Sequence, residues 1–316
     1  MAKQFNSLKT SLMTIVDQLN TLDLEELFKD GEKALEFAFQ SDMLYDGGEC
    51  HSTHHCSGTY IVIKDSYEKT GFRLQCNTCK KKKSIFYNSI FTRSMLGVNQ
   101  ILHLLYCWSQ ECSVEYSAFE CDVSQQTAIN FFQAFRMACK HWLQVEGQPQ
   151  IGGVGLNVEI DETIISKRKN HAGRVLNEVW VFGGICRETR QRFALRVPNR
   201  SAATLLPLIQ MHIEAGSTIH SDCWAAYNGI DSLPEAYSHL TVNHSQNFVD
   251  PITRSHTQTV ERMWREVKRI RRRYEGINTI DIDDHIAEYL WRSRNVLERS
   301  QAFGAAIILM SGCPFF

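Results

Sequence analysis

Residues 156–163 read LNVEIDET, and their side chains alternate between apolar and polar up to Asp161. Such alternation over about four to eight residues predicts a β-strand with one buried face. A stretch rich in glycine, GQPQIGGVG at residues 147–155, precedes this strand and predicts a boundary in the chain. Asp161 is therefore expected at the end of the first strand of a separate domain, which we place at residues 152–300.

The segments after this strand predict further strands and helices. Residues 178–189 and 190–197 are expected to form a two-stranded hairpin, and residues 201–216 are expected to form a helix. Residues 217–227 and 239–245 are expected as single strands, and residues 256–274 as a basic helix. Ser201 is the expected N-cap of the first of these helices, and Asp222 lies at the C-terminal end of the strand that follows it. The expected order is three strands, a helix, a strand, a helix, a strand and a helix. This is the order of the ribonuclease-H-like fold, so we expect an α/β domain of that type.

Three acidic residues lie at strand and helix ends in this order of elements. Asp161 and Asp222 end the first and fourth strands, and Glu261 lies near the start of the basic helix, in HTQTVERMWREVK at residues 256–268. In the ribonuclease-H-like fold, acidic residues at these places converge. Like charges about 4–5 Å apart repel by several kcal/mol per pair even at an effective dielectric constant of about 20. A cluster of this kind therefore predicts bound divalent cations.

Carboxylate oxygens with open coordination positions suit Mg²⁺ or Mn²⁺. Two such ions about 3.5–4 Å apart can activate an attacking hydroxyl and stabilise the leaving oxygen of a phosphodiester. Lys268 lies two turns after Glu261 on nearly the same helix face, where its side chain could hold the neighbouring DNA phosphate.

Each acidic residue also has a purely structural interpretation. The strand end at Asp161 could be solvated, Asp222 could cap a helix, and Glu261 could compensate the helix dipole. Three such coincidences in this order are less probable than a single site, so we expect a catalytic cluster.

A second metal-binding pattern lies near the front, in residues 45–93. Cys76 and Cys79 have the C-x2-C spacing with which two thiolates bind one tetrahedral Zn²⁺. Residues 59–64 and 71–76 predict the strands of a hairpin, which is the layout of a zinc ribbon. The other expected ligands are Cys50 and Cys56, with His54 or His55 as possible substitutes. The basic residues that follow suit contact with a nucleic-acid backbone; they are Lys80, Lys81 and Lys82.

Residues 94–148 predict a helical region that resembles a helix-turn-helix. Ser124 is the expected N-cap of the longer helix, and Gln125 and Gln126 would lead it into DNA. Three packed helices without DNA binding would give a similar pattern. We expect residues 1–44 to be an N-terminal helical segment and residues 301–316 to be a C-terminal tail.

Charge and cysteine content exclude some classes of protein. Lys and Arg total 34 against 35 Asp and Glu, so the charges nearly balance. The basic helix nevertheless has a cluster of arginines that suits DNA phosphates, unless the cluster is a solvated face: Arg269, Arg271, Arg272 and Arg273. The eleven cysteines favour a reducing compartment. Seven of them are expected as small core residues: Cys107, Cys112, Cys121, Cys139, Cys186, Cys223 and Cys313. We expect no signal peptide or membrane span, and a nuclear protein if eukaryotic or otherwise one of the cytoplasm and nucleoid.

Three segments resemble a known family. EIDET at residues 159–163, HSDCWAAY at 220–227 and HTQTVERMWREVKR at 256–269 are similar to the signature segments of Merlin-type DDE transposases. These are close to bacterial insertion-sequence transposases with an N-terminal zinc ribbon. The resemblance extends from about Cys50 to about Asn295 and includes the closing HIAEYLWRSRN.

This resemblance implies a metal-binding triad of Asp161, Asp222 and Glu261, followed by Lys268. It also implies cut-and-paste transposition on double-stranded DNA, with terminal inverted repeats and target DNA held by a homo-oligomer, a dimer or higher. Two positions depart from the pattern: the first zinc knuckle is not C-x2-C, and Gln258 stands where some bacterial relatives have Asn. The alternatives are a domesticated, non-catalytic, sequence-specific DNA-binding protein and a nuclease that performs no strand transfer.

Overall fold

The computed structural model describes most of the chain in two compact units. The described residues are 21–44, 48–50, 56–68, 70–87, 89–166, 178–242, 256–273, 282–296 and 298–311. Unit 1 comprises Met1–Trp142 and Asn295–Phe316, and unit 2 comprises Leu143–Arg294. None of the described helices combines the length and apolar character needed to cross a membrane.

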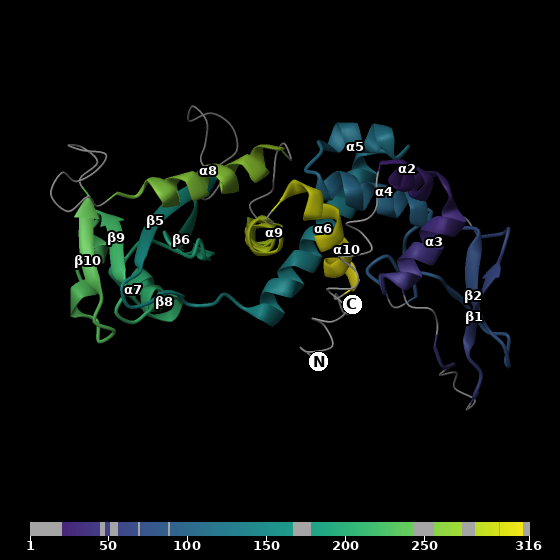
Figure 1. The fold of residues 1–316 in the computed structure, drawn as a ribbon, viewed down its shortest axis with the longest axis horizontal. Coiled ribbons are helices and arrows are strands. Elements are labelled where there is room, and N and C mark those ends of the chain that lie inside the picture. Colours follow the sequence, from purple (N-terminus) through teal and green to yellow (C-terminus); the bar gives the residue numbers. More distant parts are fainter. Residues whose placement is uncertain are drawn as a thin grey trace. The chain divides into compact units, whose positions relative to one another are not determined.

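Unit 1 combines a small sheet with packed helices (Figure 1). Its sheet is antiparallel in the order β1-β2-β3, with bounds Tyr60–Lys64, Phe72–Cys76 and Lys82–Ser84. Its helices are α2 Thr21–Lys29, α3 Gly31–Gln40, α4 Val98–Ser109, α5 Val114–Glu120, α6 Gln125–Glu146, which continues into unit 2, the 3₁₀ turn η4 Arg299–Gln301, and α10 Ala302–Ser311.

Local sequence explains several of these boundaries. The Asp30 carboxylate accepts hydrogen bonds from the N–H groups of Glu32 and Lys33 and thereby caps α3. The hydroxyl of Ser124 accepts from the N–H of Thr127 at 3.1 Å, so the predicted N-cap of α6 is confirmed. Helix α10 is apolar on all sides and almost wholly buried, as expected for a helix in a core.

Unit 2 contains a five-stranded mixed sheet. Its strands are β5 Asn157–Ser166, β6 Val179–Cys186, β7 Arg192–Val197, β9 Thr218–Asp222 and β10 Ser238–Val242, in the spatial order β10-β9-β5-β6-β7. Strands β5, β6 and β7 form an antiparallel meander, whereas β9 runs parallel to β5 and β10 runs parallel to β9. The remaining elements are a two-stranded sheet of β4 Ile151–Gly152 and β8 Ile213–Glu214, the 3₁₀ turns η1 Ala225–Tyr227 and η2 Ile230–Ser232, and helices α7 Ala202–His212, α8 Gln258–Arg273 and α9 Ile282–Asn295.

Helices cover both faces of the large sheet. One apolar core joins Val158 and Ile160 of β5 to α7, and a second core joins β6 to α8 and α9. In Figure 1, α7 and α8 lie on opposite sides of the strands. Because side chains alternate along a strand, odd-numbered residues of β5 face α8.

The connection between β9 and β10 differs from the predicted order. A helix was expected there, but the structure has only the single-turn helices η1 and η2. Gly229 and Pro234 interrupt this short segment, and both residues are unfavourable inside an α-helix.

Candidate active site

Asp161 and Asp222 lie side by side on neighbouring parallel strands. Asp222 ends β9, whereas Asp161 lies in the middle of β5, which continues to Ser166; the expectation that this strand ends at Asp161 was wrong. Asn157 pairs with Thr218, and Glu159 pairs with His220. Continuing this register by two residues places Asp161 opposite Asp222, the last residue of β9. The strand alternation and the parallel pairing together bring these two carboxylates, more than sixty residues apart in sequence, to one face of the sheet.

The carboxyl group of Asp161 is held in an environment that disfavours its charge. Burial and the negative charges of Glu162 and Asp222 raise the pKa of Asp161 to about 7, although hydrogen bonds from the backbone and from Trp264 act in the opposite direction. A group of this kind binds a proton, or a cation in place of the proton, more readily than an ordinary surface aspartate.

Trp264 connects Asp161 to helix α8. Its indole N–H donates a hydrogen bond to Oδ2 of Asp161 at 3.0 Å. Gly183, the cross-strand partner of Asp161, leaves room for this contact, since a Cβ at Gly183 would lie 2.8 Å from both Met263 and Trp264. The absence of a side chain at Gly183 therefore allows α8 to approach the sheet beside Asp161.

Glu159 anchors the start of the same helix. Its side chain is fully buried, and its Oε2 accepts hydrogen bonds from the N–H groups of Thr259 at 2.7 Å and Val260 at 3.0 Å. Its Oε1 pairs with Nε of Arg187 at 2.7 Å, and His256 lies 3.2 Å from the same oxygen. A carboxylate at a helix N-terminus satisfies otherwise unpaired N–H groups and favours the helix dipole.

Sequence reasoning missed this role for Glu159. It treated the residue only as part of an acidic strand end. The available signal was the spacing of two between Glu159 and Asp161, which places both on the face of β5 that meets α8.

Glu261 lies in the first turn of α8 and is exposed. It shares a helix face with Trp264 and with the half-buried Lys268, three and seven residues later. The hydroxyl of Thr257 donates to its carboxylate at 3.5 Å. Among the described residues, no group of three carboxylates with oxygens all within 4.8 Å of one another includes Asp161, Asp222 and Glu261. The structure thus pairs Asp161 with Asp222 and places Glu261 on the adjoining helix.

A network beside the two aspartates contains Glu162. This residue points away from α8, accepts a hydrogen bond from the hydroxyl of Tyr227, and pairs with Arg200 at 3.3 Å. The Arg200 guanidinium lies between the rings of Trp180 and Trp224, 4.1 and 4.3 Å from their centroids. Burial raises the pKa of Glu162, and the charge of Asp222 acts in the same direction.

Asp222 itself also caps a turn. Its Oδ1 accepts a hydrogen bond at 2.9 Å from the N–H of Trp224, which precedes η1. Asp222 thus closes the turn before η1 but does not cap that helix, whose N-cap is Trp224. This contact is compatible with metal binding because a carboxylate offers further lone pairs.

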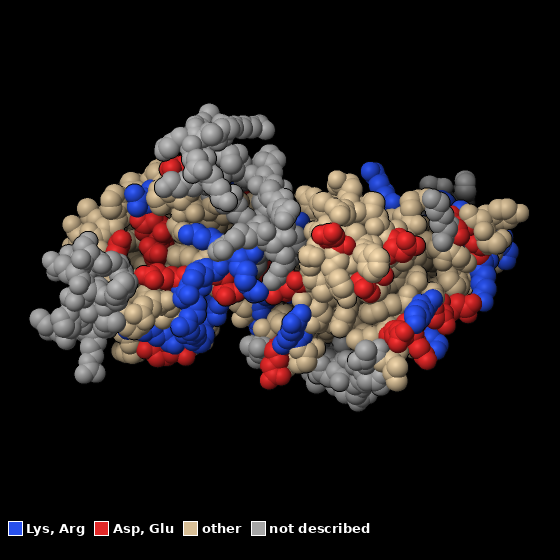
Figure 2. Space-filling model, turned by 90° about the horizontal axis from the view of Figure 1, so that it is seen from above, with Lys and Arg blue, Asp and Glu red and all other residues tan. Residues whose placement is uncertain are grey.

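The donor set of this site fits a hard divalent cation. Asp161 and Asp222 supply carboxylate oxygens, which Mg²⁺ and Mn²⁺ prefer. Burial, followed by the negative charges of Glu162 and Asp222, raises the pKa of Asp161, and a bound cation would offset all three effects. Figure 2 looks onto the side of unit 2 that carries α8 and shows acidic side chains next to basic ones there.

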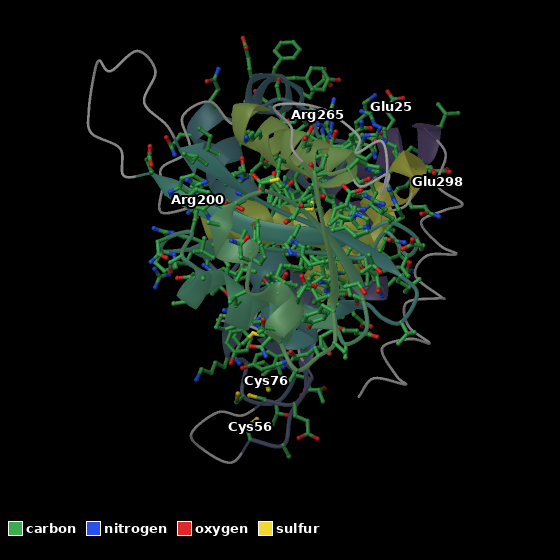
Figure 3. All side chains as sticks on the ribbon, turned by 90° about the vertical axis from the view of Figure 1, so that its left-hand side faces the viewer. Glu25, Cys56, Cys76, Arg200, Arg265 and Glu298 are labelled. Atoms are coloured by element: carbon green, nitrogen blue, oxygen red, sulfur yellow. The ribbon has the colours of Figure 1, made fainter. Side chains whose placement is uncertain are left out.

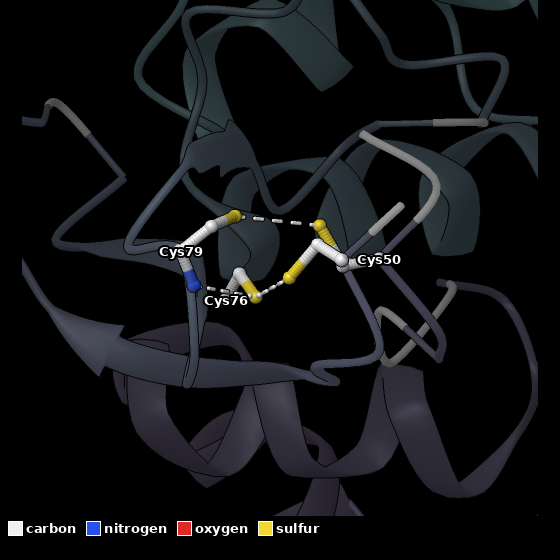
Figure 4. Close-up of side chains that lie close together, drawn as sticks. Cys50, Cys76 and Cys79 are labelled. Atoms are coloured by element: carbon white, nitrogen blue, oxygen red, sulfur yellow. Dashed lines mark hydrogen bonds between the residues drawn. The ribbon is translucent and has the colours of Figure 1, made fainter. Parts of the chain in front are cut away.

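Four cysteines of unit 1 form a second cluster. The Sγ atoms of Cys50 and Cys79 are 3.7 Å apart, those of Cys56 and Cys76 are 3.6 Å apart, and all four lie within 4.8 Å of one another (Figure 4). Thiolates bound tetrahedrally at about 2.3 Å from Zn²⁺ would be about 3.8 Å apart. The cluster is therefore compatible with a zinc site. His54 and His55, the possible substitutes, lie outside the described residues.

Backbone groups around this cluster favour the thiolate form. The N–H groups of Thr78 and Cys79 both approach Sγ of Cys76 at 3.4 Å. Burial opposes ionisation of Cys76, but these hydrogen bonds and those from the thiols of Cys79 and Cys56 lower the pKa of Cys76 to about 6. Burial and the neighbouring cysteines raise the pKa of Cys79 to about 11, so the first thiolate of the cluster is that of Cys76. In the first knuckle, the N–H of Gly58 donates to Sγ of Cys56 at 3.4 Å. Figure 3 shows the sulfur atoms of Cys56 and Cys76 close together.

The residues expected to contact DNA are exposed where their side chains are described. Lys80, Lys81 and Lys82 follow the second knuckle, and Lys82 also pairs with Asp65 at 3.1 Å. Gln125 and Gln126 lie in the first turn of α6 and face solvent. In the basic helix, Arg269 is exposed and pairs with Glu266. The side chains of the next three basic residues lie outside the described set: Arg271, Arg272 and Arg273.

Unit 2 is similar to known transposases. Residues 151–294, nearly all of unit 2, match the ISXO2-like transposase domain. An uncharacterized transposase-like protein of Haemophilus influenzae is 28% identical over 109 residues, which cover 34% of this chain and 85% of that protein. Both findings support a transposase family and a transposase function.

One solved structure is a more distant match. A chain of the cryoEM structure of the simian T-cell lymphotropic virus intasome in complex with PP2A regulatory subunit B56 gamma aligns with a TM-score of 0.32 and 16% identity, over 64% of this chain and 74% of that chain. A likeness at this level carries no argument about function.

Proposed function

We propose, from the match of residues 151–294 to the ISXO2-like transposase domain, that the chain is a DDE-type DNA transposase. In this proposal it binds the terminal inverted repeats of an element, cuts the DNA beside them and joins the freed ends to a target. The fold of unit 2 is then ribonuclease-H-like, which the order β10-β9-β5-β6-β7 supports. The family type is Merlin, for which the support is the resemblance of the three signature segments.

The observation that carries the proposal is the pairing of Asp161 with Asp222 next to α8, whose first turn donates hydrogen bonds to Glu159. Asp161, Asp222 and Glu261 would hold two divalent cations. When bound, such ions lower the pKa of an attacking water or hydroxyl and stabilise the leaving oxygen of the phosphodiester.

The residues of the chain supply orientation for this reaction. Trp264 fixes the carboxylate of Asp161 through its 3.0 Å hydrogen bond, and Glu159 fixes the first turn of α8, from which Glu261 projects. Lys268 would hold the DNA phosphate next to the reacting one. No covalent enzyme intermediate is required, because a water and then a freed 3′-hydroxyl attack the phosphodiester in line.

DNA binding is assigned to unit 1 and to α8. The cysteine cluster would bind Zn²⁺ as a zinc ribbon that presents Lys80 to Lys82, and α6 would present Gln125 and Gln126. The arginines at the end of α8 would contact phosphates without reading sequence.

The experiment that tests the proposal uses a plasmid that carries the sequences flanking the gene for this chain. The purified full chain is incubated with this plasmid, a target plasmid and Mg²⁺ or Mn²⁺. We expect cleavage at the outer ends of inverted repeats and joined products in the target plasmid. Cleavage without joining would indicate the nuclease alternative, and DNA binding without cleavage would indicate the domesticated protein. Neither alternative is favoured by the family matches.

A further inference from the structure

A second cluster of soft metal ligands lies among the helices of unit 1. His103 and Cys107 both belong to α4, and Cys121 follows the last residue of α5. One ligand atom from each of the three residues lies within 4.8 Å of the other two. Both thiols are buried, with 2% of Cys107 and 3% of Cys121 exposed.

The local fold explains why these groups meet. His103 and Cys107 are four residues apart on one helix and therefore lie on the same face, one turn from each other. The side chain of Gln100, one turn earlier, donates to the carbonyl oxygen of Cys121 at 3.2 Å and holds the end of α5 against α4. The ring of His103 stacks on Phe28 with 4.3 Å between centroids and an angle of 6°, which restricts its orientation.

Cys112 lies next to this group, outside the set whose ligand atoms are all within 4.8 Å of one another. Its N–H donates to the carbonyl oxygen of Cys107 at 2.9 Å in the turn after α4, and the side chains of Cys107 and Cys112 are hydrogen-bonded. The Cys107 side chain is also hydrogen-bonded to that of Cys121. Cys112 is half-buried, so its thiol could approach the other three residues from the solvent side as the fourth ligand.

We propose that His103, Cys107, Cys112 and Cys121 form a second zinc site, separate from the cluster of Cys50, Cys56, Cys76 and Cys79. Three thiolates and one imidazole are a usual ligand set for a structural Zn²⁺. Ligand atoms around a tetrahedral ion would be about 3.5–3.8 Å apart. Those of His103, Cys107 and Cys121 already lie within 4.8 Å of one another, and the side chain of Cys112 would turn toward them.

Cys107 and Cys121 are buried, as expected of core residues, and so are Cys139 and Cys186 in other elements. Cys112 is only half-buried, and Cys223 is exposed, so the expectation of a core position is wrong for Cys223. A bound ion would join α4, α5 and the turn that leads into α6. The bound ion would thereby help to present Gln125 and Gln126 to DNA, a role that rests on the proposed function. The metal site itself does not rest on that function.

The first test is the zinc content of the purified full chain, measured by elemental mass spectrometry. We expect two ions per chain in the wild type and one ion in Cys107→Ser/Cys121→Ser. The double variant Cys76→Ser/Cys79→Ser should also retain one ion, and the control Cys139→Ser should retain both. The proposal is wrong if the wild type holds one ion that Cys76→Ser/Cys79→Ser removes completely.

A second test remains valid if Cys107→Ser/Cys121→Ser does not fold. In Cys76→Ser/Cys79→Ser, Co²⁺ is substituted for Zn²⁺ and visible absorption is recorded with and without the milder changes Cys112→Ser and His103→Gln. We expect a thiolate–cobalt spectrum that each milder change alters, and a colourless protein would overturn the proposal. Alkylation of the denatured chain without reductant should modify every cysteine; two protected cysteines among these three would indicate a disulfide instead.

Discussion

Glu159 is a buried carboxylate that serves three partners at once. It accepts from the N–H groups of Thr259 and Val260, pairs with Arg187, and lies on the same strand face as Asp161. Glu159 is 0% exposed, and burying a carboxylate is costly unless its oxygens accept hydrogen bonds. Here the N–H groups at the start of α8 donate those hydrogen bonds. Glu159 is therefore a positioning residue, which acts on the site through the helix that carries Glu261.

The first prediction concerns Glu159→Gln. This change keeps the size of the side chain but removes the charge opposite Arg187 and the helix N-terminus. We expect the free energy of unfolding to fall by about 1–3 kcal/mol, since a buried charged partner is left incompletely satisfied. Chemical denaturation measures this loss.

The matched control for Glu159→Gln is Glu178→Gln, at an exposed position just before β6, which should change stability by less than about 0.5 kcal/mol. The double variant Glu159→Gln/Arg187→Gln should lose less than the sum of the two single losses. Additive losses would show that the ion pair contributes nothing to the seat of α8.

His212 predicts a pH dependence away from the candidate active site. It is 7% exposed, stacks on Phe193 at 4.8 Å, and its burial lowers its pKa. Above about pH 6.5 both the folded and the unfolded chain hold it neutral. Below that pH the unfolded chain binds a proton that the folded chain resists, so stability falls. Between pH 7.5 and 5.5 the wild type should lose more stability than His212→Phe, and parallel losses would contradict this.

At the scale of the elements, α8 joins the candidate site to the candidate DNA-binding surface. Its first turn carries Glu261, its inner face packs Val260, Met263 and Trp264 against the sheet, and its last turn is basic. The carboxylate at one end of such a helix can bind a metal ion, and the cations at its other end can contact phosphates of the same DNA.

The basic turn makes a prediction about salt. Changing Arg269, Arg271, Arg272 and Arg273 to Gln should weaken binding to unrelated DNA and to the element's ends to a similar degree, because phosphate contacts carry no sequence information. If all four contact phosphates, the slope of log K against log salt should become shallower by up to about 3.6. Lys29→Gln/Lys33→Gln, on α2 and α3, is the control and should keep the slope. An unchanged slope in the arginine variant would mean that this turn is a solvated face.

Most elements were predictable because their sequence signals are local. The alternation in LNVEIDET located β5, and Ser124 located the start of α6. The connection at Gly229 was predicted as a helix from the expected order of the fold alone, against the local signal of Gly and Pro. The burial of Glu159 was not predictable from composition, because a glutamate is buried only when distant partners satisfy it. The meeting of His103 and Cys107 with Cys121 likewise depends on how α4 and α5 pack.

At the scale of the whole molecule, the chain divides its tasks between two units. Unit 2 holds the paired aspartates and matches the transposase domain, and unit 1 holds both cysteine clusters and the helices proposed to bind DNA. Each unit has its own core, so loss of a metal in one need not unfold the other.

This division predicts the effect of losing zinc. Cys76→Ser/Cys79→Ser should unfold the ribbon around residues 56–87 and weaken DNA binding, because metal-binding free energy is folding free energy in so small a module. Hydrogen exchange should show loss of protection in β1 to β3 and unchanged protection in β5 to β7. Zinc analysis of the wild type that finds no bound metal would contradict the prediction, as would equal loss of protection in both units.

The central claim is that Asp161, Asp222 and Glu261 together hold the catalytic metal ions. The measurement is the rate at which variants cut DNA carrying the element's ends in Mg²⁺ or Mn²⁺, with thermal melts to show that each variant folds. We predict that Asp161→Asn, Asp222→Asn and Glu261→Gln each bind this DNA normally and lose more than about a hundredfold in cleavage rate, since loss of a direct ligand should exceed the loss for outer residues. Lys268→Ala should be milder, and Glu266→Gln, on the same helix, should cut normally. Folded Glu261→Gln that cuts normally, beside an inactive Glu266→Gln, would contradict the account.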